Sequence, residues 1–490
     1  MAGLFSFIGK ILINWITMQK IRIHFIQIAN KQLACFIFVL LVFAFVPAGL
    51  FAQEFEKPSL SQPYHITEIV IHGNKKTRPS VILREMRTQT GDTVTIEELN
   101  YDARRVESLG LFTRVEFSLE EVDIGSKLRI DVTEQWYLFP WPIFYFNDRE
   151  YKWEKASYGM SVLHSNFRGN AELFSVAGWL GYNPGAYLIY SIPAINGNKS
   201  YFLSSQFYYY KLRSKTFELL DEEIDEKQFG GSLALGYRIN LENSVQLAVG
   251  YSRIKYDPAV MGQTLHPAGR DNLPSLSLTY TRNTRDLAWY PSQGSFLSAS
   301  YQKIGFWNDA YVDYRQVTLD ARTYFTVYKS VILAGRSALL LSDGQIPPYN
   351  RAYFGYRLRI RGRFSERYEG ENRVLSSVEL RFPILPVRYI QVEEETLGNY
   401  GRNLKFGISG SVFLDMGSLW IQKANIERYR SGEMFISSGP FGLQTQPEKW
   451  VHGFGAGLNV HLPYVNIVRM ELGFNKDFDA EVIFDAEIAF

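Results

Sequence analysis

The chain of 490 residues is long enough for a small domain followed by a much larger one. Its 52 lysine and arginine residues nearly balance 50 acidic residues, and a net charge of +2 does not favour a nucleic-acid-binding protein. Aromatic residues make up 15% of the chain, which excludes a disordered or collagen-like protein. A mean hydropathy of −0.14 argues against a bundle of membrane-spanning helices. It leaves open a membrane β-barrel, whose strands alternate apolar and polar residues.

A long apolar run without charges, 33–52, lies near the N-terminus and follows several basic residues. A basic segment, an apolar segment and then small residues up to Ala52 are typical of a secretory signal peptide. We therefore expect cleavage after Ala52, which removes 1–52. An uncleaved helical anchor is the alternative that the length permits. The only cysteine, Cys35, lies in this segment, so the mature chain would have no disulfide. The polar residues 53–63 indicate a short linker.

The segment 64–136 reads as a compact α+β domain. The expected elements are a strand, two helices and two strands, at 66–72, 80–86, 96–109, 112–120 and 127–134. Thr95 is a suitable N-cap for the second helix, and Gly110 is a suitable stop.

From 137 to 490 the pattern changes to alternating segments of about ten residues, with one apolar face and one small or charged face. A soluble β-sandwich has the same alternation, so the periodicity alone leaves both folds open. The signal-like N-terminus, the aromatic residues near segment ends and the unequal loops favour a membrane barrel. We therefore predict an all-β antiparallel transmembrane barrel of about 16 strands after the α+β domain.

The last ten residues predict the strand that closes the barrel. Phe484, Ile488 and Phe490 share its apolar face, whereas acidic residues such as Glu481 and Asp485 point the other way. In a barrel these acids would face a wet lumen.

Several short motifs follow one another along the chain. They lie at 73–77, 110–115, 166–170, 284–294, 360–362, 377–383 and 413–417. The segment 64–136 resembles a POTRA domain, with its Gly-Asn turn, its paired helices and its Gly-Leu-Phe-x-x-Val step at 110–115. The remaining motifs resemble, in order and spacing, the barrel of the BamA/TamA family of outer-membrane assembly and translocation proteins.

The Ile-Arg-Gly motif at 360–362 resembles the family's motif in the long sixth extracellular loop. Several arginines lie close together here, so charge alone does not identify the anchor; the resemblance selects Arg361. It implies that Arg361 pins the loop inside the barrel, where the adjacent Gly362 would allow close backbone approach. One residue departs from the pattern, because Arg363 occupies the family's aromatic position and Phe364 follows one place later.

A guanidinium inside the lumen needs carboxylate partners. Glu379 and Asp415 lie on the polar faces of the two strands that follow the loop, and Gly417 completes the Phe-x-Asp-x-Gly motif around Asp415. We expect Arg361 to bind both carboxylates. The alternative is that these charged residues face water separately.

Catalytic motifs are missing. The seven histidines are scattered, and 407–411 lacks the final glycine of a nucleophile elbow. Gly453, Gly455 and Gly457 follow period two and fit small lumen-facing residues better than a nucleotide-binding loop, since no helix follows. We expect no catalytic residue, no metal and no cofactor.

The resemblance implies an insertase or translocase in the bacterial outer membrane, with its POTRA domain in the periplasm. Its partners would be unfolded outer-membrane client proteins, periplasmic chaperones or accessory assembly proteins, and outer-membrane lipids, but no nucleic acid. A client could add a strand to the edge that contains Phe112, Val115 and Phe117. The single POTRA domain favours an accessory role. A passive channel or receptor, or a scaffold barrel in a larger surface complex, are the alternatives.

Overall fold

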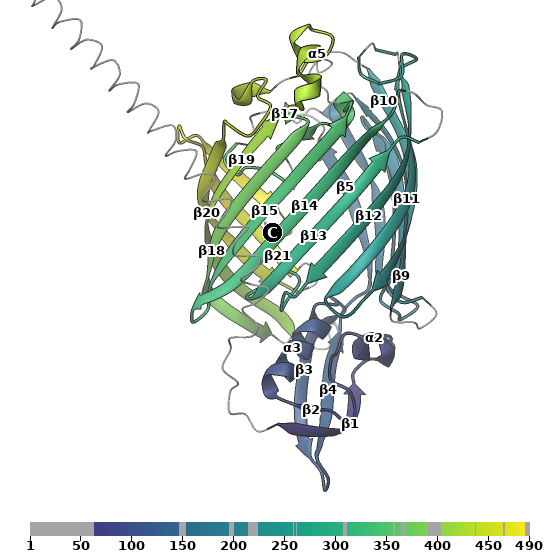
Figure 1. Ribbon diagram of the computed structural model, residues 1–490. Helices are drawn as coiled ribbons and strands as arrows, with labels where there is room; N and C mark the ends of the chain where they lie inside the picture. The colour runs from purple at the N-terminus through teal and green to yellow at the C-terminus, as the bar shows by residue number, and fades with distance from the viewer. Residues whose placement is uncertain are drawn as a thin grey trace, which may run out of the picture.

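The computed structural model describes residues 63–146, 153–195, 200–213, 224–257, 259–260, 262–306, 311–355, 358–363, 366, 368–390, 403–436, 438–463 and 466–485. The signal-like segment 1–52, the linker up to residue 62, and Phe364, Ile488 and Phe490 lie outside these residues. The described residues form a small mixed domain and, beyond one end of it, a large barrel (Figure 1).

The small domain has the predicted order of elements, with one added short strand. Its elements are β1 (Tyr64–His72), α2 (Pro79–Leu83), β2 (Thr93–Val94), α3 (Ile96–Glu107), β3 (Phe112–Glu121) and β4 (Ser126–Glu134). The sheet order is β2-β1-β4-β3, in which β1 and β4 are parallel and the other neighbours antiparallel. The strand β3 is therefore an edge strand.

The two helices differ in how well the sequence predicted them. In α3 the predicted N-cap is confirmed, because Thr95 and Glu98 form a capping box. Gly110 follows the end of α3 with φ of +66°, which a glycine adopts without strain. The first helix was predicted too long, since α2 ends at Leu83 instead of residue 86. Side chains from both helices and the sheet share one core, which includes Ile66, Ile82, Leu99, Leu128 and Ile130.

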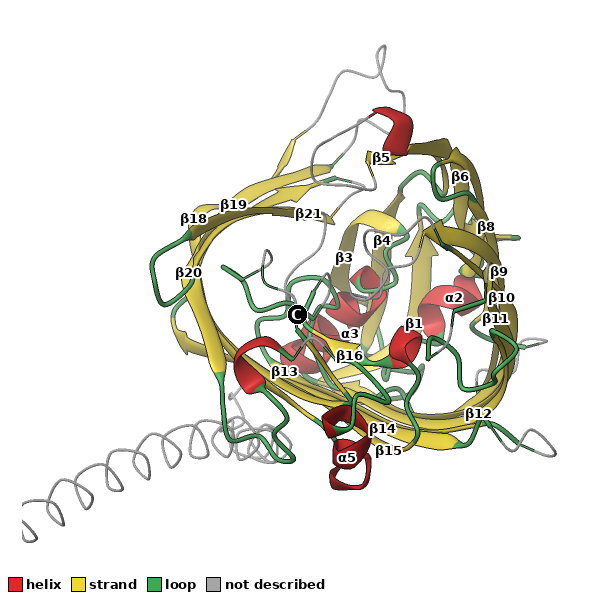
Figure 2. Cartoon of the chain, turned by 90° about the horizontal axis from the view of Figure 1, so that it is seen from above, coloured by secondary structure: helices red, strands yellow, loops and turns green. Residues whose placement is uncertain are grey.

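The barrel is a 16-stranded antiparallel sheet, as predicted (Figure 2). Its strands are β5 (Leu138–Phe146), β6 (Ala156–Phe167), β7 (Glu172–Gly181), β8 (Gly185–Ile192), β9 (Tyr201–Arg213), β10 (Asp225–Arg238), β11 (Asn243–Asp257), β12 (Arg270–Asn283), β13 (Gly294–Ile304), β14 (Tyr314–Tyr328), β15 (Val331–Gly344), β18 (Asn372–Ile390), β19 (Leu404–Trp420), β20 (Val451–Leu462), β21 (Asn466–Phe474) and β22 (Ala480–Asp485). The loops contain the short strands β16 (Ala352–Tyr353) and β17 (Glu369–Gly370) and the helix α5 (Ile426–Arg430). Across the described residues, no helix is long and apolar enough to cross a membrane.

The outer face of the barrel is apolar and exposed. Leu235, Leu247, Leu278 and Tyr301 lie opposite one another on four successive strands. Each is about half exposed, from 46% to 55%. A continuous row of exposed apolar side chains of this kind is suited to lipid.

Charged residues join the small domain to the turns at one end of the barrel. Glu85 accepts hydrogen bonds from Arg105 of α3 at 2.9 Å and from Arg238 of β10 at 2.8 Å. Nearby, Arg104 donates to Asp286, in the turn between β12 and β13, at 2.7 Å. The side chain of Glu85 is only 7% exposed, so this junction is a packed contact.

Candidate functional site: an arginine–carboxylate network in the barrel

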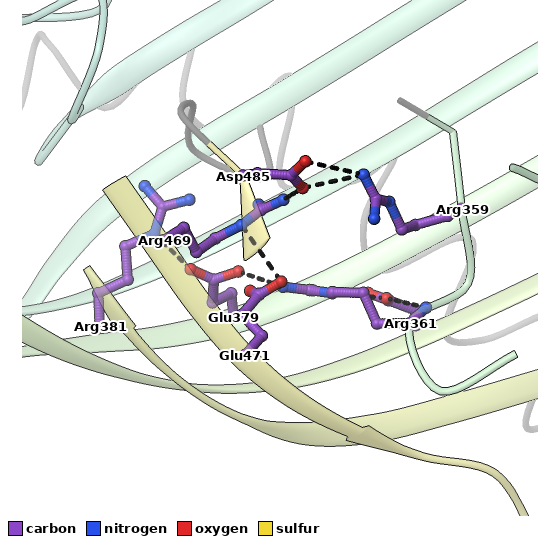
Figure 3. Close-up of polar contacts among 8 residues, drawn as sticks. Arg359, Arg361, Glu379, Arg381, Arg469, Glu471 and Asp485 are labelled. Carbon is purple, nitrogen blue, oxygen red and sulfur yellow. Dashed lines mark hydrogen bonds and ion pairs between the residues drawn. The ribbon is translucent and has the colours of Figure 1, made fainter. Parts of the chain in front are cut away.

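The loop between β15 and β18 packs against the inner wall of the barrel. Its strands β16 and β17 pair with each other. From the loop, Ala352 and Ile360 are buried in one apolar cluster with Leu375 of β18 and Leu419 of β19. This packing brings residues 358–363 over the last strands of the sheet (Figure 3).

Arg361 is the centre of the site, and its side chain is only 2% exposed. Its guanidinium binds Asp415 in two places, from Nε to Oδ2 and from Nη2 to Oδ1, both at 2.7 Å. Its Nη1 donates to Glu379 Oε2 at 2.9 Å. The backbone N–H of Arg361 also donates to Asp415, at 3.0 Å. The structure thus brings together Arg361 and the two carboxylates that the sequence suggested as its partners.

A third carboxylate, Glu471 of β21, also binds Arg361 and was missed from the sequence. Its Oε1 lies 2.7 Å from Nη1 of Arg361, and its side chain has no exposed area. The guanidinium of Arg361 also lies over the ring of Phe413, with its central carbon 3.5 Å from the ring centroid. Arg361 therefore has three anionic partners and an aromatic contact, all away from water.

Further arginines surround this centre and balance its charge. Arg381 donates to Glu379 at 2.8 Å, and Arg469 lies 3.2 Å from Glu471. Asp485 of β22 binds both Arg469 and the loop residue Arg359, the latter at 2.9 Å. The network thus joins four arginines, Arg359, Arg361, Arg381 and Arg469, to four carboxylates, Glu379, Asp415, Glu471 and Asp485. A balanced network of this kind limits the cost of burying each charge.

Glycines let the loop backbone lie directly on the wall. Gly362 has φ of +87°, and a Cβ there would meet the backbone of Phe474 at 2.5 Å. A Cβ on Gly453 of β20 would lie 1.9 Å from the carbonyl oxygen of Arg361. A Cβ on Gly473 of β21 would lie 2.6 Å from the N of Gly362. Gly453 thus faces the lumen, as its period-two spacing suggested.

Two other residues of the predicted motifs support the same loop. A Cβ on Gly417 would lie 2.5 Å from the ring of Phe354, so Gly417 makes room for the loop without touching Arg361. Arg363, at the family's aromatic position, donates to the carbonyl oxygen of His452 at 2.6 Å. The N–H of Gly362 donates to Glu481 of β22 at 2.7 Å.

The residues suggested for client binding lie on β3, and Phe484 of the predicted barrel-closing strand lies on β22. Phe112 is 5% exposed and belongs to the core of the small domain, so its side chain is not available to a client. Val115 and Phe117 are half-buried against that core. Phe117 also lines a cavity of about 310 Å³ between β3 and α3. On β22, Phe484 is 68% exposed on the outer face.

The fold and the site define a class: outer-membrane β-barrels with a small α+β domain at one end and an inward-folded loop. Comparison with known protein families identifies which family within this class the chain matches. The Omp85 superfamily domain matches residues 166–484, and POTRA, described as a surface antigen variable number repeat, matches residues 64–135. The chain belongs to the Omp85 superfamily.

Three solved structures are similar to this chain. BamA from Haemophilus ducreyi lacking POTRA domains 1–3 matches with a TM-score of 0.50 and 18% identity, over 86% of this chain and 83% of that one. CdiB from Acinetobacter baumannii matches at 0.44 and 14%, over 86% and 73%. CdiB from Escherichia coli matches at 0.45 and 12%, over 88% and 90%.

Family membership sets the location and the general role. Omp85 proteins are transport and assembly barrels of the bacterial outer membrane, and they are not enzymes. The barrel therefore lies in the outer membrane, and the POTRA domain lies in the periplasm. The barrel turns that contact Glu85 and Arg104 are consequently at its periplasmic end.

Proposed function

We propose that this protein inserts or translocates client proteins at the outer membrane, as an accessory to the principal assembly machinery. Its clients would be unfolded outer-membrane proteins, delivered by periplasmic chaperones or accessory assembly proteins. The observation that carries the proposal is the open edge of β3 among the described residues, which lies beside a cavity in the periplasmic domain.

The edge of β3 suits an extended client segment. The strand pairs with β4 along one side only among the described residues, so the other side offers backbone N–H and C=O groups. The neighbouring cavity has a mixed lining, with the apolar side chains of Ile96, Leu99, Phe117 and Leu119 beside the polar residues Asn100, Glu121 and Ser126. Backbone pairing would supply affinity for many sequences, and the cavity would select an apolar client side chain.

The described part of the barrel has a second edge. Among the described residues, β5 pairs only with β6, and β22 pairs only with β21. We call the place where the edges of β5 and β22 face each other the seam. Unpaired backbone groups there are costly in lipid, so pairing with a client strand would lower the free energy of both. On the lumen side, Arg359 binds Asp485, and the N–H of Gly362 binds Glu481. In this proposal the loop anchored by Arg361 supports the strand at the seam.

Depletion followed by an inventory of outer-membrane proteins tests the proposal. Loss of several barrel proteins supports insertion or translocation. Loss of one solute's uptake, with the inventory unchanged, would instead indicate a channel or receptor. Loss of one surface complex alone would indicate a scaffold barrel.

A further inference from the structure

A cavity of about 590 Å³ opens where the POTRA domain meets the first barrel strands. The POTRA domain contributes Lys76 to its lining, and the connection to β5 contributes Trp136. The end of β6 and the turn after it contribute His164 and Arg168. This site is separate from the Arg361 network and from the edge of β3.

The cavity lies at the periplasmic end of the lipid-facing surface. Leu138 and His164 are direct partners in the ladder between β5 and β6, so they share one face of the sheet. Farther along the same face of β6 are Met160 and Tyr158, which are 57% and 56% exposed. Since large exposed apolar side chains on a barrel face lipid, His164 lies where that surface reaches the periplasm.

Aromatic side chains gather at this level. The ring of Phe167 lies 5.7 Å from that of His164, 5.9 Å from that of Phe174 and 6.3 Å from that of Tyr190. Trp136 is 48% exposed beside them. Aromatic belts of this kind mark the level of the lipid headgroups.

The surroundings of the cavity carry excess positive charge. The cationic side chains of the turn at 74–78 and of the end of β6 are Lys75, Lys76, Arg78 and Arg168. These four cations outnumber the two nearby carboxylates, Glu134 and Glu172, of which Glu172 is paired with Arg168. Glu134 accepts the backbone N–H groups of Lys76 and Thr77 at 2.9 and 2.7 Å, and Glu172 accepts Nε of Arg168 at 2.9 Å. An anion is therefore the ligand that this environment favours.

Buried hydrogen bonds hold the two parts of the site together. The hydroxyl of Thr77 lies 2.9 Å from the hydroxyl of Tyr137 and accepts a hydrogen bond from Asn166 at 2.9 Å. The backbone N–H of Arg78 donates to the carbonyl oxygen of Gly169 at 3.0 Å. Thr77, Tyr137 and Asn166 are each at most 5% exposed. The cations of the POTRA turn are thus held in place relative to β6.

We propose that this cavity binds the phosphate headgroup of an anionic phospholipid in the periplasmic leaflet of the outer membrane. Cations from two parts of the chain converge on it, and an aromatic belt places it at headgroup depth. A free phosphate ion has the same charge chemistry. The position at the end of the lipid-facing surface assigns the site to a lipid. Such a headgroup would join Lys76 of the POTRA domain to Arg168 of the barrel.

Native mass spectrometry of the purified full chain in detergent micelles, titrated with single phospholipids, tests this assignment. The variant Lys76→Ala/Arg78→Ala removes two exposed cations and leaves the Arg168–Glu172 pair intact. The matched control is Lys127→Ala/Arg129→Ala, which removes two cations at the far end of β4. Retained resistance to unfolding in cold detergent verifies that each variant is folded.

The wild type should retain phosphatidylglycerol in preference to phosphatidylcholine. Each cation near an anionic headgroup contributes about fivefold in affinity, so the Lys76→Ala/Arg78→Ala variant should bind phosphatidylglycerol roughly 30-fold more weakly. The control variant should bind it as the wild type does. Equal retention of the two lipids by the wild type, or unchanged binding by the Lys76→Ala/Arg78→Ala variant, would overturn the proposal. Displacement of phosphatidylglycerol by millimolar inorganic phosphate would assign the site to the free ion and overturn the lipid assignment.

Discussion

Replacing Arg361 with alanine should release the loop from the barrel wall. Among the described residues, the carboxylate of Asp415 accepts hydrogen bonds only from Arg361. Glu379 would keep Arg381 as a partner, and Glu471 would keep Arg469. The substitution therefore leaves one buried carboxylate without a cation and changes a balanced network into one with a net charge of −1.

The size of the effect follows from burial. Arg361 and its three carboxylate partners are each at most 2% exposed. Removing one partner of a buried pair typically costs about 3–5 kcal/mol. Arg361→Lys should recover only part of this free energy, because an ammonium group cannot bind Asp415 in two places and still reach Glu379 and Glu471.

Two measurements check this prediction: limited proteolysis of residues 344–370 in native membranes, and the urea midpoint of the barrel in lipid vesicles. Arg361→Ala should expose the loop to cleavage and lower the midpoint, with Arg361→Lys in between. Arg430→Ala is the matched control, since its side chain is 58% exposed and pairs only with the exposed Glu427 among the described residues. If Arg361→Ala resists protease and urea as the control does, the network does not hold the loop.

The remaining predictions concern the wall, the junction, the POTRA domain and the N-terminus. Gly453→Ala should make the loop protease-sensitive, because its Cβ would lie 1.9 Å from a backbone oxygen, whereas Gly178→Ala, with open space around it, should not. Glu85→Ala should loosen the POTRA domain from the barrel, which a drop in cross-linking between engineered cysteines across the junction would reveal. Deletion of 64–136 should leave a folded barrel that no longer assists clients in a reconstituted insertion assay; full activity would refute the role of β3. N-terminal sequencing of the outer-membrane protein should begin at Gln53; an intact 33–52 segment would refute the cleaved signal.

Alternation along the sequence predicted strands with one apolar and one polar face, because lipid and a wet lumen impose opposite demands on successive residues. The choice of a barrel over a sandwich also needed the signal-like N-terminus, the aromatic residues near segment ends and the unequal loops. The same alternation placed Glu379 and Asp415 on the inner wall. The selection of Arg361 among neighbouring arginines came from the resemblance and not from charge. The structure shows why charge was insufficient, since Arg359 and Arg363 also have partners, Asp485 and the carbonyl oxygen of His452.

The role of Glu471 could not be predicted, although Glu471 alternates with the apolar residues Met470 and Leu472 along its strand. Its distance from the loop depends on the tilt and stagger of several strands, because Glu471 lies opposite Gly457 of β20, which in turn lies opposite Ser411 of β19. The junction at Glu85 was missed for a similar reason. It joins residues 153 positions apart, and no local pattern reports such a contact.

The network does more to fix the position of the loop than to stabilise the barrel. Buried ion pairs contribute little net stability compared with apolar side chains, but breaking one is costly. The ion pairs of Arg361 therefore disfavour any placement of the loop in which they are not formed. Here the contacts of the loop reach the last strand, through Asp485 to Arg359 and through Glu481 to the N–H of Gly362. If β22 moves outward to widen the seam for a client strand, β22 must either carry the loop with it or break these two contacts. The contacts between the loop and β22 therefore set a free-energy cost for moving β22, and that cost is independent of the client's sequence.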